Sequence, residues 1–243
     1  MKTTNTCVVI PIYNELPKDN EILSICRNID VLKDYDIYAV YPDGMNVDQY
    51  CLYGITNYVP FNKKYFISNK TYSRLVLSDS FYSFFNKYDY MLIAQTDTYI
   101  LNTNYSLDFF VNLKYDYYGA PWPEGPFNKP YRLREYLKCL FVRNSANLHV
   151  GNGGFSLRKI DATLNLVKKH KFYIKYIWRL NEDLFFSIHG RKGGAYTSCP
   201  IDVASQFALE TNMQSQITKG NIPYAVHAWE KYLTQNIDEI NVE

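Results

Sequence analysis

The first hundred residues alternate short apolar runs with stretches of helical spacing, and this alternation constrains the fold more than any other feature. The apolar runs have strand length and are closed by proline or polar residues. Between them lie segments with apolar residues at helical spacing. Strands are expected at 7–10, 36–41, 57–61 and 90–94, and helices at 19–29 and 69–85. Strands that alternate with helices predict an α/β fold: a mostly parallel central sheet with helices on both faces.

Polar residues follow three of these strands at the point where each strand ends. Ile12-Tyr13-Asn14 comes after the first strand, Pro42-Asp43-Gly44 after the second, and Gln95-Thr96-Asp97 after the strand at 90–94. Open sheets of this kind bind ligands at the carboxyl ends of their strands. We therefore expect these three polar segments to converge on one crevice.

The second half of the chain is less regular. It shows no internal repeat, linker or low-complexity stretch, so a single domain of 243 residues is predicted. Strands are expected at 115–119, 155–158 and 223–229, and helices from 159 to 169 and at 181–189 and 203–210.

Composition excludes some functions. With 26 Lys and Arg against 24 Asp and Glu, the charge is too balanced for a dedicated nucleic-acid binder. No apolar run reaches the roughly 18 residues of a membrane span. Five cysteines without CxxC spacing predict a reduced cytoplasmic protein with buried thiols. The 24 tyrosines suit stacking on sugars and bases, or reflect codon usage, and both explanations stay open.

Gln95-Thr96-Asp97 resembles the DxD motif of GT-A-fold glycosyltransferases. Further segments occur in the order seen in small bacterial glycosyltransferase-like domains from surface-polysaccharide loci, and the chain resembles that family over nearly its whole length. These segments are VVIPIYNE at 8–15, SRLVLSDSFYSFF at 73–85, YDYYGAPWP at 115–123, VGNGGFSLRK at 150–159, NEDLFF at 181–186, ASQFALE at 204–210 and PYAVHAWEKY at 223–232.

The resemblance implies a GT-A-like, Rossmann-like single domain over 1–243, with a nucleotide-binding half at 1–100 and an acceptor-binding half at 101–243. Asp97 matches the aspartate that binds metal and the nucleotide diphosphate, and His227 matches a C-terminal histidine on the metal. The implied cofactor is Mn²⁺ or Mg²⁺. Gln95 departs from the motif, since it offers a neutral amide oxygen. Position alone leaves Asp97 open as a turn cap and His227 open as a core residue.

Glu182 and Asp183 are the candidate catalytic residues. The pair resembles the xED motif of inverting GT-A enzymes, which implies that Asp183 is the general base and Glu182 a supporting or acceptor-binding residue. The residues alone also allow a simpler interpretation. Acidic side chains in the first turn of a helix are stabilised by its dipole without any catalytic role.

The remaining site predictions concern substrate binding. Asn14 and Asp43 are expected at the nucleotide, and Arg74 at the diphosphate, although each also fits a plain turn or surface position. In the loop Gly151-Asn152-Gly153-Gly154, glycines permit positive φ and a close approach of the backbone to a ligand, or form only a tight turn. Resemblance puts this loop in the donor and acceptor pocket, and Trp122 and Trp229 are the aromatic residues predicted to bind substrate there.

The implied function is metal-dependent, inverting transfer of a sugar from a nucleotide donor, with UDP expected. The acceptor would be a saccharide, free or lipid-linked, in O-antigen or capsule synthesis. Basic and aromatic residues at 131–143 and 169–179 suit contact with the inner face of the cytoplasmic membrane, or packing on the core. One alternative is a non-catalytic glycan- or nucleotide-binding protein, for which Gln95 argues. A sugar nucleotidyltransferase is disfavoured, since 10–15 lacks a Gly-rich basic loop.

Overall fold

A computed structural model of the chain describes residues 5–122, 150–189, 195–233, 237 and 240. Six strands form its central sheet in the order β3-β2-β1-β4-β7-β6. The strands β1 to β4 run parallel, whereas β7 is antiparallel to both β4 and β6. Their bounds are β1 Thr6–Pro11, β2 Asp36–Pro42, β3 Asn57–Phe61, β4 Tyr90–Ala94, β6 Tyr117–Tyr118 and β7 Phe155–Lys159.

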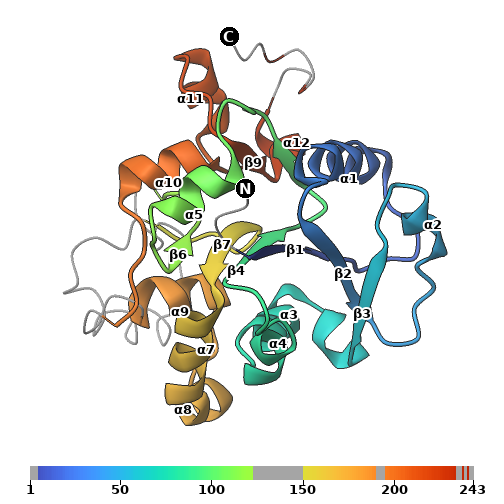
Figure 1. Cartoon of the computed structure of the whole chain (residues 1–243), viewed down its shortest axis with the longest axis vertical. Helices are drawn as coiled ribbons and strands as arrows, with labels where there is room; N and C mark the ends of the chain where they lie inside the picture. The colour runs from blue at the N-terminus through green and yellow to red at the C-terminus, as the bar shows by residue number, and fades with distance from the viewer. Residues whose placement is uncertain (1–4, 123–149, 190–194, 234–236, 238–239, 241–243) are drawn as a thin grey trace.

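Helices cover both faces of this sheet. In Figure 1, α1 (Asp19–Leu32) lies on one side, and α3 (Asn69–Val76), α4 (Asp79–Phe84) and α7 (Ile160–Lys169) lie on the other. Every residue of β1 and β4 is buried, as expected for strands with both faces covered. The predicted fold class, a mostly parallel central sheet flanked by helices, is confirmed.

The helix predicted at 69–85 is two helices, because serine side chains cap each of them. Ser68 accepts a hydrogen bond from the N–H of Thr71, and Ser78 accepts one from the N–H of Phe81, 3.3 Å away. A serine at the N-cap satisfies a backbone donor that the new helix leaves unpaired. The break ends α3 early and leaves its buried residues, Tyr72 and Ser73, beside the start of α9 (Glu182–His189).

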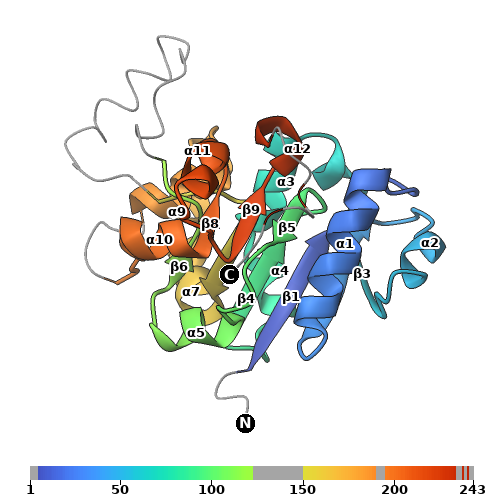
Figure 2. The same cartoon turned by 90° about the horizontal axis from the view of Figure 1, so that it is seen from above.

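A second, three-stranded sheet has the order β5-β9-β8, and Figure 2 shows its strands side by side. These strands are β5 (Thr98–Ile100), β9 (Ala225–His227) and β8 (Ala208–Leu209). The helix predicted at 203–210 ends earlier in the structure than predicted, so this boundary was wrong. That helix is α10 (Ile201–Phe207), and Ala208 is extended because it pairs with Ala225 in β9.

The other described elements are short. They are α2 Asp48–Cys51, η1 Lys63–Phe66, α5 Leu107–Asn112, α8 Lys171–Tyr176, α11 Met213–Thr218 and α12 Trp229–Tyr232. None of the helices in the described ranges is both long and apolar enough to cross a membrane. The prediction of buried thiols is half correct: Cys7 and Cys199 are buried, while Cys26 and Cys51 are exposed, and none of these four described cysteines forms a disulfide.

Candidate functional site

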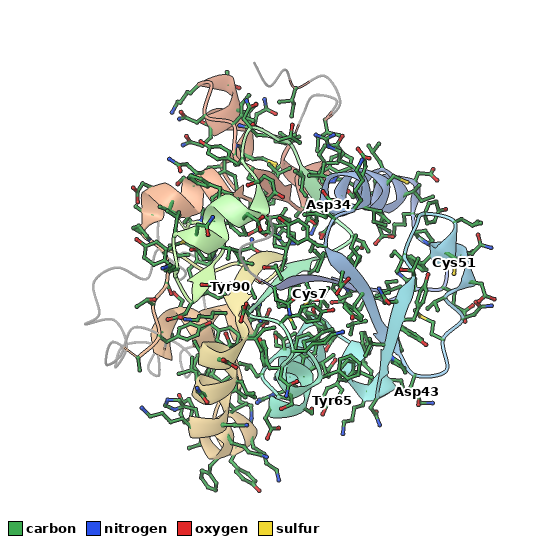
Figure 3. All side chains as sticks on the ribbon, in the orientation of Figure 1. Cys7, Asp34, Asp43, Cys51, Tyr65 and Tyr90 are labelled. Atoms are coloured by element: carbon green, nitrogen blue, oxygen red, sulfur yellow. The ribbon has the colours of Figure 1, made fainter. Side chains whose placement is uncertain are left out.

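A cavity of about 490 Å³ opens beside the carboxyl ends of β1 and β4. Tyr13 reaches it after β1, and Gln95, Thr96 and Asp97 reach it after β4. Two of the three polar segments predicted to converge therefore do so. Asp43 does not line the cavity: it is exposed in the turn after β2, where its N–H donates to the carbonyl of Phe61 at 2.8 Å, at the outer edge of the sheet (Figure 3).

Asp97 and His227 meet in this cavity although 130 residues separate them. The N–H of Ala228 donates to the carbonyl of Asp97 at 2.9 Å, and this bond brings the end of β9 beside the end of β4. His227 Nε2 then lies 3.4 Å from Asp97 Oδ1. Burial alone would raise the pKa of the Asp97 carboxyl, but the hydrogen bond and charge of His227, with the charge of Lys231, lower it.

Glu210 extends this pair on the other side of the imidazole, and no role was predicted for it. Its Oε1 lies 3.5 Å from His227 Nδ1, a buried atom without a hydrogen-bond partner. Its Oε2 accepts from Asn152 Nδ2 at 2.5 Å, and Asn152 Oδ1 accepts from the N–H of Gly154 at 2.8 Å. A line of contacts thus joins Asp97, His227, Glu210 and Asn152. The available signal was the segment ASQFALE, which contributed to the family resemblance and to a predicted helix but carried no prediction for Glu210.

The glycines of the loop before β7 make room for the functional side chains. A Cβ on Gly154 would lie 2.2 Å from His227 Nε2, and one on Gly153 would lie 2.1 Å from Glu182 Oε1. Both distances are far below van der Waals contact. The expectation of positive φ in this loop was wrong, because the described glycines with positive φ are Gly44, Gly54 and Gly220. Absence of a side chain, rather than backbone freedom, is what the site requires.

Glu182 is buried and held from two sides. Its Oε2 accepts a short hydrogen bond from Ser73 Oγ on α3, and its Oε1 lies 3.9 Å from Arg158 Nη2 on β7. Arg158 is itself fully buried and donates to Tyr82 Oη at 2.8 Å and to Ser156 Oγ at 3.2 Å. The sequence did not indicate this buried cation. Its charge compensates the carboxylate of Glu182 beneath the cavity floor.

Asp183 lines the same cavity and differs from its neighbour. It is half-buried, and its Oδ1 accepts from the N–H of Leu184 at 2.6 Å. Burial and the nearby charge of Glu182 raise the pKa of Asp183 to about 7. Two adjacent carboxyls thus have distinct roles open to them: Glu182 is tied to Ser73 and Arg158, whereas Asp183 can exchange a proton near neutral pH.

Besides Asp43, four more predicted residues lie outside the lining of this cavity. Arg74 points into a separate groove and donates to the carbonyls of Ile174 and Trp178. Asn14 is exposed, and its carbonyl accepts from Tyr50 Oη at 2.9 Å. Trp122 covers Gly151, on which a Cβ would lie 2.2 Å from the ring.

Trp229 is the fourth. Its Nε1 donates to Ser24 Oγ at 2.9 Å, and its ring packs edge-on against Tyr99. This tryptophan belongs to the small core between α1 and the second sheet. The basic stretch at 131–143 lies outside the described residues.

The donor atoms of Asp97 and His227 fit a shared cation. Two ligands that are each about 2.1 Å from a metal, at right angles, stand about 3 Å apart. The 3.4 Å between Asp97 Oδ1 and His227 Nε2 is near that value. Across the described ranges, His, Cys, Asp and Glu side chains form no group of three that could hold a metal. Protein ligands to a cation here would thus be few.

Solved glycosyltransferases share this fold. A glycosyltransferase involved in the glycosylation of the major capsid of PBCV-1 matches with a TM-score of 0.51 and 12% identity, over 96% of this chain and 95% of that one. The galactosyltransferase LgtC, solved with donor and acceptor sugar analogs, matches with a TM-score of 0.50 and 11% identity, over 90% and 86%.

The bifunctional glycosyltransferase WbbM matches with a TM-score of 0.53 and 12% identity. The match covers 96% of this chain but only 46% of WbbM. At these identities the likeness establishes the fold. No curated protein matches the sequence. A family model described as protein of unknown function DUF5672 matches residues 56–227, most of the chain, and the chain belongs to that family.

Proposed function

We propose that this protein is a metal-dependent glycosyltransferase that moves a sugar from a nucleotide donor to a saccharide acceptor. The observation that carries the proposal is the cavity in which Asp97, His227, Glu182 and Asp183 meet. These residues come from the ends of β4 and β9 and from the start of α9. The fold shared with solved glycosyltransferases supports the same reading.

Asp97 and His227 would hold the cation, Mn²⁺ or Mg²⁺, with diphosphate oxygens and water as its other ligands. Such a cation offsets the charge that develops on a departing diphosphate. An oxygen and an imidazole nitrogen are acceptable ligands for Mn²⁺. Gln95 lines the cavity beside Asp97 and supplies a neutral amide at the diphosphate. With so few charged protein ligands, we expect metal binding that depends on the nucleotide.

Asp183 is the proposed general base. A carboxyl whose pKa is about 7 can remove a proton from an acceptor hydroxyl as that oxygen attacks the anomeric carbon. Glu182 is already bound by Ser73 and lies near Arg158, so it positions the start of α9 and the adjacent acceptor rather than taking the proton. Attack by an activated hydroxyl opposite the leaving diphosphate inverts the anomeric configuration.

The substrates follow from this scheme. We propose a UDP-sugar donor near residues 1–100, a saccharide acceptor near residues 101–243, and a role in bacterial surface-polysaccharide synthesis in the cytoplasm. The cavity is lined from both halves of the chain, which supports this division. Asn152 lines the same cavity and donates to Glu210, so we expect it beside the bound sugars.

A nucleotide-sugar screen tests the proposal. The protein is incubated with UDP-, GDP-, CMP- and dTDP-sugars, with and without Mn²⁺, and release of the nucleotide is measured. We expect metal-dependent hydrolysis of one donor class. Asp183→Asn should abolish transfer and keep nucleotide affinity, whereas Asp97→Ala should weaken Mn²⁺-dependent nucleotide binding. Asp30→Asn, a change at a side chain that is 69% exposed, is the matched control and should behave as wild type.

The outcomes separate the components of the proposal. Retained turnover in Asp183→Asn would remove Asp183 as the base, and unchanged binding in Asp97→Ala would misplace the metal. Nucleotide binding without any hydrolysis or transfer would favour a non-catalytic binding protein. NMR assignment of the product anomer tests inversion, which a retained configuration would contradict.

A further inference from the structure

Helix α8 and the residue after it expose a group of large apolar side chains. Phe172 is 71% exposed, Tyr176 53% and Ile177 46%, and the rings of Phe172 and Tyr176 lie 4.7 Å apart. We call these three residues the α8 patch. Soluble proteins seldom expose adjacent large apolar side chains unless that surface contacts something else.

The α8 patch is surrounded by cations. Residues 168–179 contain five Lys and Arg and no Asp or Glu, and all five are exposed: Lys168, Lys169, Lys171, Lys175 and Arg179. Lys171 pairs with Asp79 on α4 at 2.8 Å. A groove of about 630 Å³ continues the positive surface onto α3, where Lys70 and Arg74 line it. The surface therefore combines exposed aromatic rings with a strong local excess of positive charge.

The orientation of this surface is fixed by the opposite side of the same segment. Ile174 and Trp178 are buried in the main core, and their carbonyls accept hydrogen bonds from Arg74. Figure 1 shows α7 and α8 at one end of the molecule, projecting away from the central sheet. Because α8 is anchored through these residues, Phe172 and Tyr176 are not needed for its packing.

We propose that the α8 patch docks this protein on an anionic phospholipid membrane. The aromatic and aliphatic side chains would enter the headgroup region, and the surrounding lysines would contact lipid phosphates. The positive charge around the α8 patch favours an anionic membrane over a second copy of the chain. Two copies that met through this patch would bring two basic surfaces together, which is unfavourable.

The membrane surface would lie next to the candidate active site. Arg179 precedes Glu182 by three residues, and α3 carries Arg74 in the basic groove and Ser73 in the cavity. This consequence rests on the proposed function: a lipid-linked acceptor would be presented beside the catalytic carboxyls. The docking itself does not require sugar transfer and can be tested without it.

Vesicle co-sedimentation provides the test. The whole chain is mixed with vesicles of phosphatidylcholine alone or of phosphatidylcholine and phosphatidylglycerol in equal parts. We expect sedimentation with the anionic vesicles only, and its loss in about 1 M NaCl, where charges are screened within about 3 Å. Each lysine near the surface contributes roughly a fivefold gain in affinity. A triple variant should therefore lose on the order of a hundredfold in affinity; its changes are Lys168→Gln, Lys169→Gln and Lys175→Gln.

Matched variants control for exposure and charge. Phe172→Ser with Tyr176→Ser should weaken binding, whereas Leu52→Ser, at a side chain that is 74% exposed elsewhere, should not. The control for charge is a triple variant at exposed lysines away from α8, with changes Lys33→Gln, Lys63→Gln and Lys219→Gln.

Three results would overturn the docking proposal. They are no sedimentation, equal sedimentation with neutral vesicles, and undiminished binding in the α8 variants. A concentration-dependent dimer that Phe172→Ser abolishes would also overturn it, because the patch would then be a contact between copies. Transfer to a soluble acceptor is measured in parallel, so that failure of docking and failure of the proposed activity are seen separately.

Discussion

Replacing Asp183 with asparagine should stabilise the protein, and the gain should grow with pH. The pKa of this carboxyl is about 7 in the folded chain against 3.8 in the unfolded chain. Protonation is therefore favoured by folding. The stability that this group contributes is complete below pH 3.8 and is lost as pH rises through 7. Asparagine has no charge to bury, and its oxygen can still accept the hydrogen bond from Leu184.

The size of the effect follows from the two pKa values. At pH 8 the difference corresponds to about 4 kcal/mol of folding free energy, and at pH 5 to about 2 kcal/mol. Urea unfolding followed by tryptophan fluorescence, at both pH values and equal ionic strength, measures it. We expect Asp183→Asn to raise the unfolding free energy more at pH 8 than at pH 5, while abolishing transfer. Wild-type transfer should rise with pH up to about 7, because the base must be ionised.

Asp97→Asn is the matched control, because its sign is opposite. The pKa of Asp97 is lowered in the folded state, so the ionised form contributes stability above the unfolded pKa. This variant should lose stability at pH 8. A stability change in Asp183→Asn that is independent of pH, or changes of the same sign in both variants, would refute the electrostatic assignment of this cavity.

Three further substitutions probe the supports of the site. Gly154→Ala should weaken Mn²⁺-dependent nucleotide binding in calorimetry, because its Cβ would displace His227 Nε2, and unchanged affinity would contradict this. Glu210→Gln should lower metal affinity about 10- to 100-fold with little change in melting temperature, as for carboxylates that orient a metal-binding histidine, whereas full affinity would remove Glu210 from that role. Arg158→Met should cost about 3–5 kcal/mol in urea unfolding, since Glu182 would be left buried and unpaired, and a loss below 1 kcal/mol would contradict this.

The central sheet could be predicted because its signals are local. The strands at 57–61 and 90–94 match the structure at both ends, since each is a short, mostly apolar segment that a polar residue, Asn62 or Gln95, follows. The same logic correctly placed Tyr13 and Asp97 at one edge. It misplaced Asp43, because a turn at the carboxyl end of β2 can point away from the crevice as well as into it.

The pairing of the second sheet could not be predicted from local patterns. The strand predicted at 223–229 contains β9, but β5 and β8 have three and two residues, too few to show any periodicity. Their pairing joins segments that are far apart in the chain, such as Thr98 with His227. Arg158 was missed for a related reason. A cation in an apolar strand looks like a surface residue until its buried partners, Tyr82 and Glu182, are known.

The small sheet is therefore what brings the residues of the candidate active site together. Pairing of β8 with β9 carries Glu210 to His227, and pairing of β9 with β5 carries His227 to Asp97. Gly154, whose carbonyl accepts from the N–H of Gln95 at 2.8 Å, fits against the imidazole only because it lacks a side chain. A neutral glutamine in the DxD-like motif is compatible with the proposed metal site, because the second proposed protein ligand, His227, comes from β9 rather than from the motif itself.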